Sequence, residues 1–182
     1  PKGMGIGSID YKSEEFLIQA LMAHDLAMIQ AYKTGDVYLA FGKDSKVIPM
    51  DGTKLSHPVL RQACKGTVLG LSYLMSKVGL AKKLSQDLGR YVSEIEAQEW
   101  IDTFEDTYVE AREFKEDLKN EYGNSVIDFI KSADGWYIWG ENPNFRSICN
   151  FPIQTMGSCI LRKAVQLAQD AGLEVIFTLH DA

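Results

Sequence analysis

Two short apolar segments, one near each end of the chain, enclose a long stretch with helical patterning. Residues 4–9 and 174–179 carry the apolar and β-branched side chains typical of buried strands, and they lead into Asp10 and Asp181. A third β signal lies between them, where Asp134-Gly135 separates two apolar runs and predicts a hairpin. This order predicts an α+β fold, in which a helical insertion separates two strands that can pair.

Capping and breaking residues divide the helical stretch into segments. Helices are expected over residues 13–24, 26–33, 56–75, 93–123 and 144–171, with a shorter helix that ends near residue 88. Ser13, Ser56 and Ser93 are the expected caps, Gly79 and Gly123 the expected breaks, and Pro152 the expected site of a kink. Residues 43–54 combine Gly, Asp and Pro and predict a loop.

The composition is that of an ordinary globular protein and argues against several other classes of protein. Of the 182 residues, 46% are apolar and 24% are charged, and no apolar run reaches the roughly 18–20 residues of a membrane span. The three cysteines, Cys64, Cys149 and Cys159, form no C-x-x-C pair, which argues against a zinc site or a disulfide framework. The net charge of −6 argues against a nucleic-acid-binding surface spread over the whole molecule, although local cations and metal ions count for more.

One expected helix carries a row of side chains at four-residue spacing: Arg61, Lys65, Leu69 and Tyr73. Each step of four residues turns an α-helix by about 400°, so these side chains share one face. Two cations beside an apolar side chain and a phenol suit a polyphosphate that carries a base. A solvated helix face accounts for the cations, but not for Leu69 and Tyr73 beside them.

Four motifs, in order along nearly the whole chain, resemble those of the family A DNA polymerases, the DNA polymerase I type. Asp10-Tyr11-Lys-Ser-Glu-Glu15 resembles D-Y-S-Q-I-E, and Arg61-x3-Lys65-x7-Tyr73 resembles R-x3-K-x3-[FY]-G-x2-Y-G. Arg146-x3-Asn150-x3-Gln154 resembles R-x3-N-x3-Q, and His180-Asp181-Ala182 resembles H-D-E.

The resemblance implies a polymerase palm, a small antiparallel sheet with helices, that carries a mainly helical fingers insertion. Residues 1–36 are expected to form palm, residues 37–125 the fingers with a nucleotide-binding helix at about 57–76, and residues 126–182 palm again. The thumb and exonuclease regions of the family are not expected within these residues. We therefore expect the isolated fragment to be weakly active or inactive.

The activity that the resemblance implies is template-directed DNA synthesis, in which dNMP passes from dNTP to a primer 3′-OH and pyrophosphate leaves. Such phosphoryl transfer uses two metal ions held by oxygen ligands. By resemblance, Asp10, Asp181 and the backbone carbonyl of Tyr11 hold two Mg²⁺ ions. An aspartate that follows a strand is more often a turn or cap residue, and only the matched motifs favour the metal role here.

The resemblance also assigns the substrate-binding residues. Arg61, Lys65, Leu69, Tyr73 and Tyr38 are expected at the incoming nucleotide, with Lys65 also protonating the leaving pyrophosphate. Glu15 and Tyr73 resemble the pair that excludes a ribose hydroxyl. Arg146, Asn150, Gln154 and His180 are expected on the primer–template DNA, since amides can reach acceptors common to all base pairs in the minor groove.

Several positions depart from the family pattern. Leu69 stands where Phe or Tyr is usual, Leu74 where glycine is common, and Tyr38 where bacterial enzymes have histidine. Together these departures indicate a phage-encoded replicative member that works in the bacterial host cytoplasm, with no membrane partner and an unidentified processivity factor. Two other functions stay open: a single-subunit RNA polymerase relative, against which Glu15 argues, and a non-catalytic helical nucleic-acid-binding or interaction module.

Overall fold

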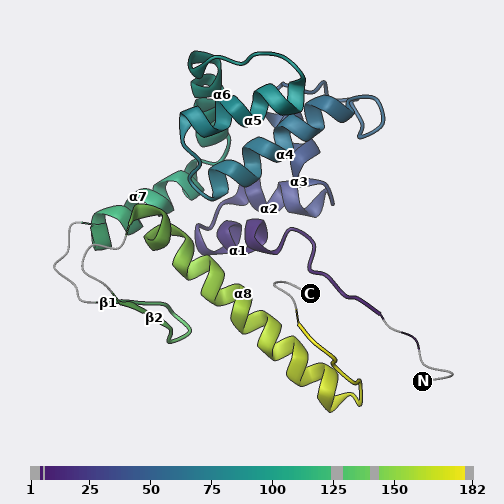
Figure 1. Ribbon diagram of the computed structural model, residues 1–182, viewed down its shortest axis with the longest axis vertical. Coiled ribbons are helices and arrows are strands. Elements are labelled where there is room, and N and C mark those ends of the chain that lie inside the picture. Colours follow the sequence, from purple (N-terminus) through teal and green to yellow (C-terminus); the bar gives the residue numbers. More distant parts are fainter. Residues whose placement is uncertain (1–4, 6, 124–128, 140–143, 179–182) are drawn as a thin grey trace.

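The computed structural model describes residues 5, 7–123, 129–139 and 144–178. In chain order these residues form α1 (Glu14–Met22), α2 (Leu26–Lys33), α3 (Val37–Asp44), α4 (Pro58–Ser72), α5 (Lys77–Leu88), α6 (Glu94–Thr107), α7 (Val109–Gly123), β1 (Phe129–Lys131), β2 (Tyr137–Trp139) and α8 (Phe145–Asp170). Helices α1 to α7 pack together, and the C-terminal half of α8 extends away from them (Figure 1). No helix in this described part of the chain is long and apolar enough to span a membrane.

An aromatic cluster lies at the centre of the main core. The Tyr108 ring is fully buried and lies 5.2 Å from the Phe104 ring and 5.8 Å from the Phe16 ring, centroid to centroid. Tyr108 leaves the helical conformation (φ −123°, ψ 66°), so α6 ends and α7 begins there. The single helix expected over residues 93–123 is therefore wrong. The apolar periodicity continues on both sides of Tyr108, so it does not reveal the break at which this buried ring lies.

A smaller core joins α7, the hairpin and α8. Its buried members are Leu118, Ile130, Ile148 and Cys149. Strands β1 and β2 pair antiparallel, with Ile130 opposite Ile138. The predicted hairpin is confirmed, and with it the α+β class: a mainly helical chain with a small antiparallel sheet.

Other helix boundaries differ from those expected. Ser13 precedes α1 with a left-handed backbone (φ 50°), and its side chain makes no capping hydrogen bond. His57 rather than Ser56 is the N-cap of α4, and α3 continues to Asp44, so the expected loop begins later. Gly79 lies inside α5 and breaks no helix, because α4 already ends at Ser72.

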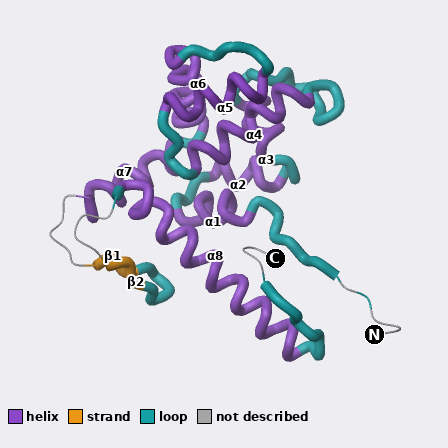
Figure 2. The backbone as a smooth tube through the Cα atoms, viewed as in Figure 1, coloured by secondary structure: helices purple, strands orange, loops and turns teal. Residues whose placement is uncertain are grey.

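The strands expected at both ends of the chain are wrong within the described residues. Residues 5, 7–9 and 174–178 belong to no strand, and Figure 2 draws the described segments at both ends as loop. Their side chains are open to solvent, with Ile9 79% and Phe177 75% exposed. β-branched and aromatic content favours a strand only where a neighbouring strand completes the hydrogen bonds, and no described segment pairs with either one.

Candidate active site

Helix α4 presents the predicted row of side chains on one face. Pro58 occupies its first turn, where the missing N–H costs nothing. The opposite face is buried against α3, α5 and α6 through Ala63, Cys64, Thr67, Val68 and Leu71. The row itself stays accessible: Arg61 and Lys65 are half-buried, while Leu69 is 38% and Tyr73 39% exposed. Burial of one face thus fixes which way the cations point.

Arg61 is held by a carboxylate that the sequence motifs did not single out. Its Nε donates to Asp36 Oδ2 at 2.7 Å, and Asp36 also caps α3 by accepting from the Leu39 amide at 3.1 Å. Burial acts to raise the pKa of Asp36, but the hydrogen bonds from Arg61 and Leu39 outweigh it and hold the pKa below its usual value. Asp36 therefore orients the guanidinium. The sequence could not predict this pair, because Asp36 lies 25 residues from Arg61 and no periodic spacing links them. The one available signal was that Asp36 lies two residues before Tyr38.

Tyr38 lies against both cations of the row. Its ring centroid is 5.5 Å from Arg61 Cζ and 5.7 Å from Lys65 Nζ, which is cation–π distance. Burial raises the pKa of the Tyr38 hydroxyl, so the phenol stays protonated and available as a donor. The structure thus brings Tyr38 to the two cations, and its role at an incoming nucleotide stays a prediction.

Three residues far apart in sequence meet at one carboxylate. The Tyr73 hydroxyl donates to Glu15 Oε2, and Gln154 Nε2 donates to Glu15 Oε1 at 2.5 Å. Gln154 Nε2 also lies 3.3 Å from the Tyr73 hydroxyl. Helix α1 supplies Glu15 in its first turn, α8 supplies Gln154, and Tyr73 is the C-cap of α4. This polar cluster of Glu15, Tyr73 and Gln154 joins the three helices at the end of the cationic row.

The turn after α4 explains two positions of its motif. The Met75 amide donates to the Gly70 carbonyl at 2.8 Å and the Leu74 amide to the Leu71 carbonyl at 3.1 Å, the pattern of a Schellman motif. A Cβ on Gly70 would lie 3.0 Å from the Met75 side chain, so glycine allows the close approach. Leu74 occupies the left-handed position (φ 57°) where such motifs usually have glycine.

The expected DNA-contacting row lies on α8. Arg146, Asn150 and Gln154 follow one another at four-residue spacing, with Arg146 exposed and the other two half-buried. The helix runs on through Pro152, where the Thr155 hydroxyl donates to the Phe151 carbonyl at 2.9 Å and lies 3.0 Å from the Pro152 carbonyl. Of this row, the structure brings Gln154 to the polar cluster.

The metal-binding role of Asp10, Tyr11 and Asp181 stays a prediction. Asp10 and Tyr11 are exposed, while His180 and Asp181 lie outside the described residues. Across the part of the chain that is described, no three His, Cys, Asp or Glu side chains gather closely enough to hold a metal ion. The oxygen donors of Asp10 and of the Tyr11 backbone nevertheless suit a hard cation such as Mg²⁺.

Comparison with known proteins adds to this geometry. Residues 1–181 match the family described as DNA polymerase family A. The fold is similar to the POL domain of Pol1 from M. smegmatis, solved in complex with DNA primer-template and dNTP, with a TM-score of 0.76 and 24% identity. That match covers 94% of this chain and 31% of the Pol1 chain, so this chain spans about a third of that protein. None of the curated proteins compared with the sequence is a match.

The order of the four motifs, the α+β fold and the residues gathered at α4 agree with this match. Over nearly its whole length, the chain belongs to DNA polymerase family A.

Proposed function

We propose that this chain forms the nucleotide-binding part of a DNA-directed DNA polymerase, which adds dNMP from dNTP to a primer 3′-OH and releases pyrophosphate. The observation that carries the proposal is the contact of Glu15, Tyr73 and Gln154 at the end of the row that begins with Arg61 and Lys65. One surface therefore combines cations for a triphosphate with a fixed carboxylate for a sugar. Its partners are primer–template DNA and dNTPs, in the cytoplasm of the cell or phage host.

The cationic row binds the triphosphate in this proposal. Arg61 and Lys65 lie one helical turn apart, and Asp36 and the Tyr38 ring hold them in place before any nucleotide arrives. Donors that are already oriented cost little reorganisation when charge develops on the phosphates. Lys65, unlike the guanidinium of Arg61, can also give its proton to the leaving pyrophosphate.

Sugar selection belongs to the polar cluster. The carboxylate of Glu15 accepts from both Tyr73 and Gln154, so it is fixed from two sides. A ribose 2′-hydroxyl would have to displace one of these bonds or fit where the carboxylate lies. The proposed preference is therefore for dNTP over NTP, which distinguishes this function from that of an RNA polymerase relative.

Asp10, the Tyr11 carbonyl and Asp181 would hold two Mg²⁺ ions, which supply charge neutralisation for phosphoryl transfer when bound. Residues 1–36 and 126–182 then act as palm and residues 37–125 as fingers. Asn150 and Arg146, on the same face of α8 as Gln154, together with His180, are proposed to contact the primer–template end.

Primer extension by the longest natural chain that contains residues 1–182 tests the proposal. Asp10→Ala should lower single-turnover incorporation of dNTP by roughly a thousandfold or more, because the lost metal ligand stabilises the transition state by several kcal/mol. Asp51→Ala is the matched control, since Asp51 is an exposed turn aspartate outside the four motifs. Unchanged incorporation by Asp10→Ala contradicts the catalytic proposal, and a preference for NTP contradicts the role given to Glu15.

A further inference from the structure

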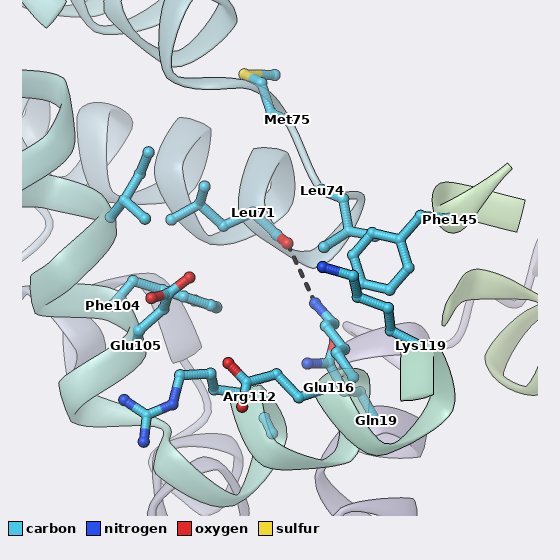
Figure 3. Close-up of a pocket in the computed structure, with 13 residues that line it drawn as sticks. Gln19, Leu71, Leu74, Met75, Phe104, Glu105, Arg112, Glu116, Lys119 and Phe145 are labelled. Atoms are coloured by element: carbon cyan, nitrogen blue, oxygen red, sulfur yellow. Dashed lines mark hydrogen bonds between the residues drawn. The ribbon is translucent and has the colours of Figure 1, made fainter. Parts of the chain in front are cut away.

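The C-terminal end of α4 receives a charged cap from a distant helix. Lys115 Nζ, on α7, donates to the Leu71 carbonyl and to the Ser72 carbonyl, each at 3.1 Å. The dashed line that reaches the Leu71 carbonyl in Figure 3 marks the first of these bonds. A cation here also faces the negative end of the helix dipole, which favours the contact.

Lys115 is fixed on its own side as well. It is 7% exposed, and its backbone carbonyl accepts from Cys149 Sγ of α8 at 3.6 Å. Burial lowers the pKa of Lys115 to about 8, against the opposing influence of Cys149 and Glu105, so the amine is still mostly charged at pH 7. A buried ammonium is costly unless it is hydrogen-bonded, and the two carbonyls of α4 supply those bonds.

A cavity of about 340 Å³ adjoins this contact. Its walls include Leu71, Leu74, Met75, Phe104, Lys115 and Phe145. Side chains at this end of α4 therefore border open space instead of a filled core. The bonds from Lys115 therefore add to the backbone bonds of the Schellman turn that hold this end in place.

Tyr73 follows Ser72 directly, and its hydroxyl donates to Glu15. We propose that Lys115 is a positioning residue for nucleotide selection: it holds the last carbonyls of α4 so that Tyr73 stays on Glu15 and Gln154. This inference rests on the proposed polymerase function. It assigns a role to a residue that none of the four motifs contains.

Three variants in the longest natural chain that contains residues 1–182 test this role. Lys115→Met keeps the length of the side chain and removes the donors, whereas Lys115→Arg restores them. Lys119→Met is the control, because Lys119 lies one turn further on α7, lines the same cavity and contacts the Phe145 ring at 5.2 Å. The measurements are KM and kcat for dNTP, the preference for dNTP over NTP, and hydrogen exchange at residues 73–75.

We expect Lys115→Met to raise KM for dNTP roughly tenfold and to lower the preference for dNTP roughly tenfold, because a charged hydrogen bond at a site is worth about that factor. Lys115→Arg should recover most of both, and Lys119→Met should leave both unchanged. Amides at residues 73–75 should exchange faster in Lys115→Met alone. If Lys115→Met does not fold, Lys115→Gln, which keeps one donor group without the charge, replaces it.

A lower melting temperature with unchanged KM, preference and exchange would overturn the inference, because it would leave Lys115 a purely structural role. An inactive wild-type chain would instead count against the proposed polymerase function. In that case the exchange at residues 73–75 still decides whether Lys115 holds the end of α4.

Discussion

Leu74 combines an unfavourable backbone conformation with favourable packing of its side chain. Its backbone is left-handed (φ 57°), a conformation that costs a side chain about 1–2 kcal/mol and glycine almost nothing. Its side chain is half-buried and packs against the small core that contains Ile148 and Cys149. Packing therefore offsets strain, which explains how leucine is accommodated where the Schellman motif favours glycine.

Two variants separate the strain from the packing. Both Leu74→Ala and Leu74→Gly lose the side-chain contacts, but only alanine keeps a Cβ in the left-handed backbone. Glycine escapes the strain of about 1–2 kcal/mol but loses more chain entropy on folding, which offsets part of that gain. We therefore expect Leu74→Gly to be the more stable of the two by about 0.5–1 kcal/mol, measured as the free energy of unfolding in urea. Equal stability, or a more stable Leu74→Ala, would show that position 74 is not strained.

At this scale the sequence predicted side chains that lie along one helix but not those that meet across helices. Spacing alone places Arg61, Lys65, Leu69 and Tyr73 on one face, and the structure confirms that they share it. Neither Asp36 against Arg61 nor Lys115 against the end of α4 could be predicted that way. Such pairs depend on how helices pack, and one sequence carries no periodic signal for them.

Among the elements, the join between α2 and α7 depends on one buried carboxylate. Asp25 is fully buried and caps α2 by accepting from the Met28 amide at 2.8 Å. Its second oxygen accepts from the Ala111 amide in the first turn of α7 at 3.1 Å. One side chain therefore accepts a hydrogen bond from an amide at each of two helix N-termini, where amides have no acceptor within their own helix.

Removal of this carboxylate should be costly. Asp25→Ala leaves the Met28 and Ala111 amides without their side-chain acceptor, and the Ala111 amide belongs to a different helix from Asp25. We therefore expect this variant to lower the free energy of unfolding by about 2–4 kcal/mol. Ser76→Ala is the matched control, since Ser76 caps α5 from an exposed position with one bond to the Gly79 amide at 3.2 Å. Its expected cost is about 1 kcal/mol. Similar losses in both variants would show that Asp25 acts only as an ordinary cap.

Helices were more predictable than strands because a helix makes its hydrogen bonds within one segment. The sequence placed α2, α8 and the hairpin correctly, where caps, periodicity and a turn signal agree. It joined residues 93–123 into one helix, which is wrong, since no local residue marks the break at Tyr108. It also placed strands at both chain ends, where the described residues have no pairing partner.

On the scale of the whole molecule, charge and shape point to local rather than global recognition. The net charge of −6 opposes a phosphate backbone overall, yet Arg61 and Lys65 are gathered with Tyr38 on one face. Asp36 pairs with Arg61, and the Tyr38 ring lies against both cations. The proposed site for a charged substrate is therefore this one face, not a basic surface spread over the molecule.

Helix α8 divides into two halves with different burial, which predicts a gradient of stability along it. All of its buried residues, Ile148, Cys149, Ile153 and Thr155, lie in the first half, whereas Leu167 in the second is 54% exposed. That second half extends away from the other helices (Figure 1). Cys159 Sγ donates to Asp134 Oδ2 at 2.7 Å and Arg162 Cζ lies 4.7 Å from the Trp136 ring centroid, so contacts with the hairpin reach as far as Arg162. Helices in water owe most of their stability to packing of one face, so residues 163–170, beyond these contacts, have little to hold them.

We therefore expect amides of residues 163–170 to exchange at least about a hundredfold faster than those of residues 60–72 in the 182-residue chain, as measured by hydrogen-exchange mass spectrometry. Helix α5 is the control, because it is shorter than α8 but buries Leu80, Ala81 and Leu84. It should exchange slowly if burial rather than length sets the rate. Equal protection of residues 145–157 and 163–170 would mean that the end of α8 is stabilised without buried contacts, so that burial does not set the order of this helix.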